Sequence, residues 1–208
     1  MHHLLLGLTL LLIAVQTIGN ENGGLYSRIV LGGVIVGSMA AVYERRKMFF
    51  VGLLLGCPTL ISLAFQGNLV LTSAGLVLGI ATIAFVCVVL LLGIYGRSSV
   101  SSSSVSASLV VYLLIGIMWS MAYLLVETNA PGSFYGLSDT GLDGTRRDLF
   151  YYSFVTLTTV GYGDIGPLGP GARALAILEA VIGQFYLVVL VASLVGMFLS
   201  ERSPHTKS

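Results

Sequence analysis

TLTTVGYGD, residues 156–164, is a glycine-containing stretch that lies between a short apolar run and a long one. The run before it, 149–157, is about half as long as a bilayer crossing requires, which is roughly 20 residues. The run after it, 172–199, is long enough to cross. Irregular backbone at membrane depth is tolerated only where protein buries it or where it lines a watery cavity. The pattern therefore predicts a re-entrant loop, in which a short helix enters the membrane without crossing it.

The composition indicates a membrane setting for the whole chain. Of its 208 residues, 56% are hydrophobic and 9% are charged, whereas soluble domains carry about 25% charged residues. So few charges cannot cover the surface of a soluble globule, because Lys, Arg, Asp and Glu of soluble proteins lie mostly outside the core. The formal net charge of +1 provides no basic field for a phosphate backbone. These numbers exclude a soluble enzyme, a disordered chain and a nucleic-acid binder.

Apolar runs predict the transmembrane helices. They cover residues 4–19, 25–43, 48–65, 69–95, 109–126 and 172–199. The first run is short, and we interpret it as a retained span; a cleaved signal peptide is the alternative, although a basic leader and a clear cleavage site are missing. The expected fold class is an all-α membrane protein with six transmembrane helices and a re-entrant helix between the fifth and the sixth.

Serine marks the boundary between two domains. Eight of the eleven residues of 98–108 are serine, which is typical of a flexible linker. We therefore expect a four-helix unit over 1–97, a cytoplasmic linker over 98–108, a second domain over 109–199 and a short cytoplasmic tail over 200–208.

Lys and Arg in the loops predict the orientation, because they collect on the cytoplasmic side. One side holds Arg45, Arg46, Lys47, Arg97, Arg202 and Lys207, and the other holds Arg28, Arg146, Arg147 and Arg173. The cluster at 45–47 lies in a short loop and should dominate. We expect a multi-pass protein of the plasma membrane, the inner membrane in a bacterium, with both termini cytoplasmic.

Catalytic and metal-binding groups are missing from the sequence. The histidines are His2, His3 and His205, all near the ends of the chain, and Cys57 and Cys87 lie in separate apolar runs. No spacing among them matches a metal site or a disulfide framework. The sequence therefore predicts neither an enzyme nor a metal protein.

Two glycines of the quoted stretch predict its chemistry. Gly161 and Gly163 alternate with Val160 and Tyr162, and glycine adopts left-handed backbone conformations readily. The alternation allows successive carbonyl groups to point to one side. A ring of such strands would present layers of carbonyl oxygens, which can replace the hydration shell of a monovalent cation.

Residues 159–164 resemble the TVGYGD signature of the tetrameric potassium channel family, and the resemblance covers about the last hundred residues. It implies an outer helix, a pore helix, a selectivity filter and an inner helix within 109–199. It also implies a potassium-selective channel that conducts K+ passively across the lipid bilayer and needs no cofactor. Because the family builds a pore from four filter strands and this chain has one, the resemblance implies a homotetramer. A less selective cation channel, a potassium transporter subunit and a regulatory pore subunit of a larger channel stay open.

The resemblance assigns roles around the filter. The ion-binding residues would be Thr159, Val160, Gly161, Tyr162 and Gly163, the last at the outer mouth. Filter support would come from Asp164, Tyr151 and Tyr152, where many relatives carry tryptophans in place of the two tyrosines.

The inner helix carries the expected gate and cavity. Gly183 aligns with the gating hinge of relatives, and the alternative is close packing against a neighbouring helix. The resemblance implies that Gln184, Leu187, Val191 and Val195 line the cavity, and their spacing places them on one helical face.

Glu179 is the only acid well inside an apolar run, where an ionisable group costs at least about 2.5 kcal/mol. At roughly 100° per residue, it lies about 140° from Gln184 around the helix. We therefore expect a buried support behind the filter, bonded to hydroxyls of the short helix. A direct ion site or a gating proton acceptor is the alternative.

The fourth run bears on gating. A voltage sensor needs several Lys or Arg in this helix, and 69–95 contains none. We expect no conventional voltage gating.

Overall fold

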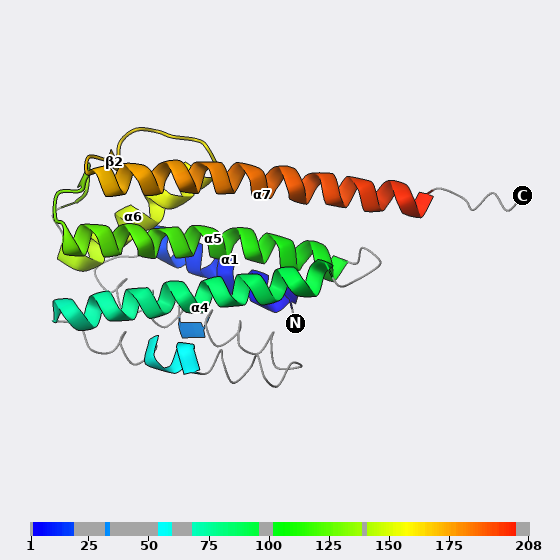
Figure 1. Cartoon of the computed structure of the whole chain (residues 1–208), viewed down its shortest axis with the longest axis horizontal. Helices are drawn as coiled ribbons and strands as arrows, with labels where there is room; N and C mark the ends of the chain where they lie inside the picture. Colours follow the sequence, from blue (N-terminus) through cyan, green and yellow to red (C-terminus); the bar gives the residue numbers. More distant parts are fainter. Residues whose placement is uncertain are drawn as a thin grey trace, which may run out of the picture.

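The computed structural model describes residues 2–18, 32–33, 54–59, 68–95, 102–138 and 141–202. The elements are the helices α1 (His2–Ile18), α4 (Leu69–Tyr95), α5 (Ser102–Asn129), α6 (Gly141–Leu157) and α7 (Pro170–Arg202), with the short strands β1 (Phe134–Tyr135) and β2 (Gly166–Pro167). The long helices α4, α5 and α7 lie side by side, and α7 extends beyond the others at one end (Figure 1). Residues 32–33 and 54–59 are helical, but the expected second and third spans lie mostly outside the described residues.

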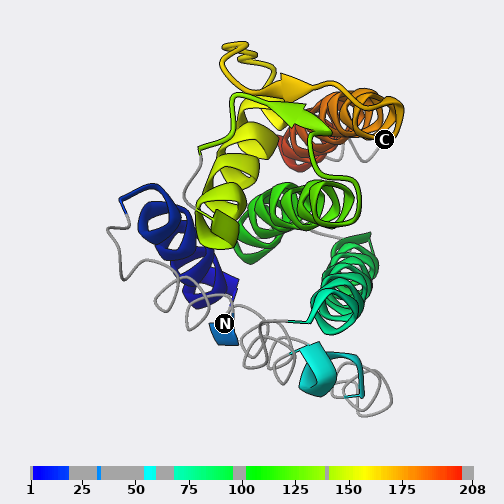
Figure 2. The same cartoon turned by 90° about the vertical axis from the view of Figure 1, so that its left-hand side faces the viewer.

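Helix α5 is the centre of the bundle. It contacts α1, α4, α6 and α7, and Figure 2 shows it surrounded by these four helices. Val110, Val111, Leu114 and Tyr123 of α5 are completely buried. The other helices are therefore positioned chiefly by packing against the side chains of α5.

Among the residues that the structure describes, three helical segments are long and apolar enough to cross a membrane. They are Leu69–Ile94, Ser104–Asn129 and Pro170–Ser193. A helix suits this setting because all its backbone hydrogen bonds are internal. The predicted all-α membrane character agrees with these helices, and six spans stay a prediction.

The serine-rich segment is helical where the structure describes it. Helix α5 begins at Ser102, so the prediction of a flexible linker over 98–108 is wrong for 102–108. Ser108 donates a hydrogen bond of 3.0 Å to the Ser104 carbonyl, and Tyr186 of α7 donates one of 2.7 Å to the Ser108 carbonyl. Serine is tolerated here because its hydroxyl bonds to a carbonyl one turn earlier in the same helix.

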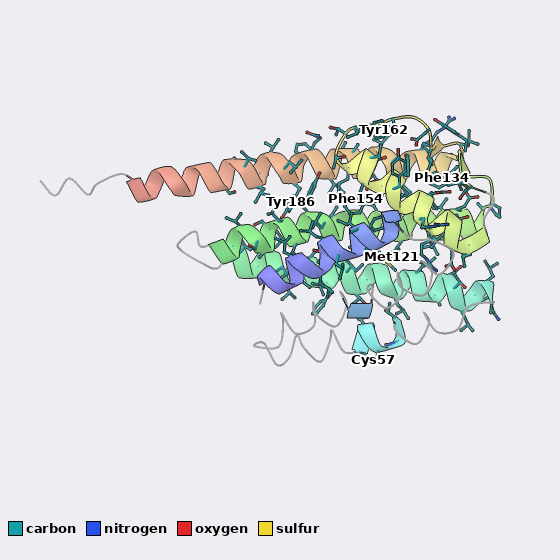
Figure 3. The ribbon with its side chains drawn as sticks, turned by 180° about the vertical axis from the view of Figure 1, so that it is seen from behind. Cys57, Met121, Phe134, Phe154, Tyr162 and Tyr186 are labelled. Carbon is teal, nitrogen blue, oxygen red and sulfur yellow. The ribbon has the colours of Figure 1, made fainter. Side chains whose placement is uncertain are left out.

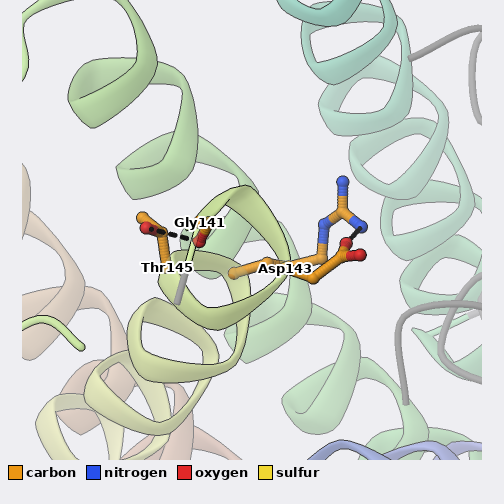
Figure 4. Close-up of polar contacts among 4 residues, drawn as sticks. Gly141, Asp143 and Thr145 are labelled. Carbon is orange, nitrogen blue, oxygen red and sulfur yellow. Dashed lines mark hydrogen bonds and ion pairs between the residues drawn. The ribbon is translucent and has the colours of Figure 1, made fainter. Parts of the chain in front are cut away.

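Helix α6 begins earlier than the apolar run 149–157 predicts. Its first two turns, from Gly141, are polar. Asp143 and Arg146 form an ion pair of 2.9 Å, and Thr145 donates to the Gly141 carbonyl (Figure 4). Pairs three residues apart face each other on a helix, so these local pairs extend the helix beyond its buried half. The apolar run covers only the buried half and therefore predicted too late a start.

A small hairpin joins the two loops that flank α6. Strands β1 and β2 are antiparallel, with Phe134 opposite Pro167 and Tyr135 opposite Gly166. Phe134 packs edge-on against Tyr123 at 5.4 Å between ring centroids and against Tyr152 at 5.6 Å. The aromatic contact fixes the hairpin to α5 and α6.

We expect Phe134→Ala to destabilise the protein by about 3–5 kcal/mol, the usual cost of removing a buried phenyl ring. Thermal unfolding of the detergent-solubilised protein measures this. The matched control is Leu168→Ala, a large apolar residue next to the same hairpin that is 49% exposed, where the change should stay within about 0.5 kcal/mol. Equal losses in both variants would contradict an anchoring role for Phe134.

Candidate functional site

The loop 158–164 begins by closing the end of α6. The amide of Thr158 donates to the Phe154 carbonyl, that of Thr159 to Thr156, and those of Val160 and Gly161 to Val155, at 3.0 to 3.3 Å. Carbonyl groups in the last turn of a helix lack partners within the helix. The loop supplies those partners and starts from a fixed position.

Backbone conformations alternate along the loop. The φ angles of Thr159, Gly161 and Gly163 are positive, at 60°, 56° and 79°, while those of Val160 and Tyr162 between them are not. Alternation of left-handed with ordinary conformations allows successive carbonyl groups to point toward the same side of the loop. Glycine supplies two of the three left-handed positions without steric cost.

The loop lies open on the surface of the single chain. All residues from 158 to 164 are exposed, and Tyr162 is 70% exposed. Figure 3 shows Tyr162 at the outer edge of the molecule, whereas Phe154 lies inside, beside α5.

Two tyrosines hold the end of the loop. Tyr151 of α6 stacks on Tyr162, with ring planes 5° apart and centroids at 6.5 Å, and its hydroxyl donates to the Asp164 carboxylate at 2.8 Å. This hydrogen bond raises the pKa of the Tyr151 phenol, so the phenol keeps its proton as donor. Tyr135 of β1 donates to the Gly163 carbonyl at 3.3 Å.

Tyr152 lies elsewhere. Within the chain it does not join Tyr162, and it packs at 5.1 Å from Tyr123 in the aromatic cluster with Phe134. Of the two tyrosines expected to support the loop, the structure brings Tyr151 to it directly.

Glu179 lies behind α6 and is completely buried. The Tyr123 hydroxyl of α5 donates to its Oε2 atom. The Ser153 hydroxyl of α6 lies 2.6 Å from its Oε1 atom and 2.8 Å from the Gly116 carbonyl of α5. One carboxyl group thus connects α5, α6 and α7, one turn before α6 ends.

Tyr112 and Tyr123 make hydrogen bonds around the site that the sequence analysis did not predict. Tyr112 donates to the Leu157 carbonyl at 3.2 Å, the last residue of α6, and its ring stacks on Tyr186 of α7 at 5.9 Å. A signal existed, because a tyrosine hydroxyl inside an apolar helix needs a partner. The partners are far apart in sequence, and the apolar pattern does not identify them.

Gly183 makes a close contact in this structure. Helix α7 continues through it, and a Cβ atom at this position would lie 2.8 Å from Leu157 Cδ1 and 3.1 Å from the Leu157 carbonyl oxygen. Of the residues expected to line a cavity, Gln184 and Val191 are exposed and Leu187 is half-buried, while the side chain of Val195 lies outside the described residues. Across the described ranges, no cluster of three or more His, Cys, Asp or Glu could hold a metal ion.

Comparisons with known proteins converge on one family. Residues 123–200 match the family described as "Ion channel". The chain is 33% identical over 91 residues to the inward rectifier potassium channel Kirbac3.1 of Paramagnetospirillum magnetotacticum, covering 42% of this chain and 27% of that protein. It is 32% identical over 108 residues to potassium voltage-gated channel subfamily A member 10 of Mus musculus, covering 51% and 20%. It is 33% identical over 91 residues to two pore potassium channel c of Oryza sativa subsp. japonica, covering 44% and 18%.

The chain therefore spans between 18% and 27% of the length of these three relatives. No solved structure matches it. Residues 123–200 thus match the ion channel family, and these three relatives are potassium channels, in agreement with the resemblance of residues 159–164.

Gly183→Ala separates the two interpretations of Gly183. If close packing dominates, the new methyl group meets Leu157 and the protein loses about 1–3 kcal/mol of stability. If Gly183 acts only as a hinge, alanine favours the helix and stability rises by up to about 1 kcal/mol. We expect the loss, measured by thermal unfolding. Gly171→Ala, in the same helix with open space around its Cβ, is the control and should be close to neutral.

Proposed function

We propose that the chain forms a K+-selective pore for passive conduction, on the premise that residues 123–200 match the ion channel family and that the relatives reported above are potassium channels. The observation that carries the proposal is the alternating φ of residues 159–163 within the sequence TVGYG. Carbonyl oxygens aligned on one side of a strand are suited to replace the water around a monovalent cation.

In this proposal the loop is the selectivity filter. The carbonyl groups of Thr159, Val160, Gly161 and Tyr162, with the Thr159 hydroxyl, bind the permeant K+ ions, and Gly163 lies at the outer mouth. The contacts of Tyr151 and Tyr135 with the loop support this role, because a filter must resist collapse around a smaller ion. The residues present offer carbonyl and hydroxyl oxygens and require no bound metal or organic cofactor.

We propose a homotetramer, since each chain has one such loop. The exposed surface of the single chain supports assembly. Besides the open loop, α7 carries large exposed apolar side chains along one broad side: Ile177, Leu178, Val181, Ile182, Phe185, Val188, Val189 and Val191. In the tetramer these residues would meet other copies or the hydrocarbon of the bilayer, and both termini would face the cytoplasm.

Gating by a conventional voltage sensor is not part of the proposal. Helix α4 precedes the pore segment as a fourth span would, yet Leu69–Tyr95 carries no charged side chain. Each charge that moves through the membrane field couples about 2.3 kcal/mol per 100 mV, and a helix without charges gains nothing from the field.

Flux into proteoliposomes tests the function. The purified chain alone should carry K+ down its gradient and exclude Na+. Gly161→Ala should reduce K+ flux about tenfold or more, because alanine costs about 1–2 kcal/mol in the left-handed region and pulls each filter strand out of its alternation.

Gly141→Ala is the matched control. Gly141 also has a positive φ and open space for a Cβ, so the backbone strain is similar, but the residue lies at the start of α6, away from the loop. We expect its flux to stay near that of the unmodified protein. Equal K+ and Na+ flux would favour the less selective cation channel, and no flux from a well-formed assembly would favour a regulatory subunit.

Native mass spectrometry of the detergent-solubilised protein tests the assembly. We expect a species of four copies of the 21.9 kDa chain. Gly161→Ala should assemble equally well, because its Cβ meets nothing within the chain. A conducting protein that contains only one or two copies would contradict the proposed pore.

A further inference from the structure

The hydrogen bonds around Glu179 require one more proton than the neighbouring hydroxyl groups can supply if Glu179 is ionised. Three close oxygen pairs meet here: Tyr123 with Glu179, Ser153 with Glu179, and Ser153 with the Gly116 carbonyl. Each pair needs one proton between its oxygens. A tyrosine and a serine hydroxyl contribute one proton each, so two protons serve three pairs if Glu179 is ionised.

A proton on Glu179 completes the set. Tyr123 then donates to Oε2, the protonated Oε1 donates to the Ser153 oxygen, and Ser153 donates to the Gly116 carbonyl. Every hydroxyl donates once, and every short contact is a hydrogen bond. No arrangement with an ionised Glu179 satisfies all three pairs.

The surroundings of Glu179 favour the neutral form as well. The titratable groups that face it are Tyr112 and Tyr123 on α5 and Tyr152 on α6, all neutral as phenols. In the part of the chain that the structure describes, no Lys or Arg forms an ion pair with it. A buried carboxylate without a cation beside it is strongly disfavoured, because burial removes its hydration.

We propose that Glu179 carries a proton in the conducting protein and that the neutral carboxyl is a latch between the pore helix and its two neighbours, which opens when the proton is lost. The inference rests on the proposed function and adds a regulatory input, alkaline pH, to the same site. An ionised Glu179 takes the single proton of Ser153 and leaves the Gly116 carbonyl without a donor. That breaks the hydrogen bond between Ser153 of α6 and Gly116 of α5, one turn before α6 ends.

Infrared spectroscopy tests the protonation without any need for conduction. At neutral pH the unmodified protein should show the carbonyl stretch of a protonated carboxyl group, and Glu179→Gln should lack it. Glu127→Gln is the control, because Glu127 accepts hydrogen bonds from the amides of Gly132 and Phe134 and should not contribute to this band. Identical spectra for the unmodified protein and Glu179→Gln would overturn the proposal.

Flux as a function of pH tests the latch. Flux through the unmodified protein should fall reversibly at alkaline pH, by up to about tenfold per pH unit for each titrating proton. Glutamine reproduces the neutral acid, because its amide donates to Ser153 while its carbonyl accepts from Tyr123. Glu179→Gln should therefore conduct within about twofold of the unmodified protein at neutral pH and lose the alkaline response. The tyrosines are unchanged in this variant, so a persistent response would overturn the latch.

A second variant covers the case in which Glu179→Gln does not fold. Ser153→Ala removes the link to Gly116 and should weaken the alkaline response, while a full response would overturn the latch. If the unmodified protein carries no K+ at any pH, the proposed function fails. The latch is then judged by the infrared band and by a thermal midpoint that falls at alkaline pH in the unmodified protein and not in Glu179→Gln.

Discussion

The attachment of the last turn of α6 is the constraint on which the functional site depends. Ser153 and Leu157 lie on successive turns of this helix, and both are held from α5: the first by the Gly116 carbonyl, the second by the Tyr112 hydroxyl. Helix α7 holds the same turn from the other side through Glu179 and Gly183. A loop that leaves α6 at Leu157 thus starts from a position set by two long helices.

This attachment matters because the loop has little structure of its own. In the proposed filter, carbonyl groups that turn to one side for an ion would be unavailable for hydrogen bonds within the chain, so the loop could not stabilise itself as a helix or a sheet does. Its far end is held instead by Tyr135 on Gly163 and by Tyr151 on Tyr162 and Asp164. Both ends are anchored by side chains, and in the proposed filter the backbone between them would be free to bind the ion.

The sequence predicted those parts of the fold that depend on local pattern. The run 69–95 coincides with α4, because the apolar residues and the helix end together there, and glycine indicated two of the positive φ positions. The starts of α5 and α6 were missed, since serine hydroxyls and the pair of Asp143 with Arg146 extend helices beyond their apolar parts. Tyr123 was missed because its partner lies 56 residues further along the chain, a distance over which no local pattern acts.

The contacts that position the loop and the contacts that would complete a pore belong to different levels of structure. Every anchor of the loop, from Ser153 to Tyr135, lies within one chain. One strand, however, offers a single carbonyl oxygen at each level, whereas a cation that sheds its water needs several oxygens around it. In the proposed tetramer each copy therefore arrives with its loop already held, and assembly adds only the missing oxygens. A substitution at Glu179 or Tyr112 would then alter the shape of the loop in each copy directly. It would alter the contacts between copies only through that change of shape.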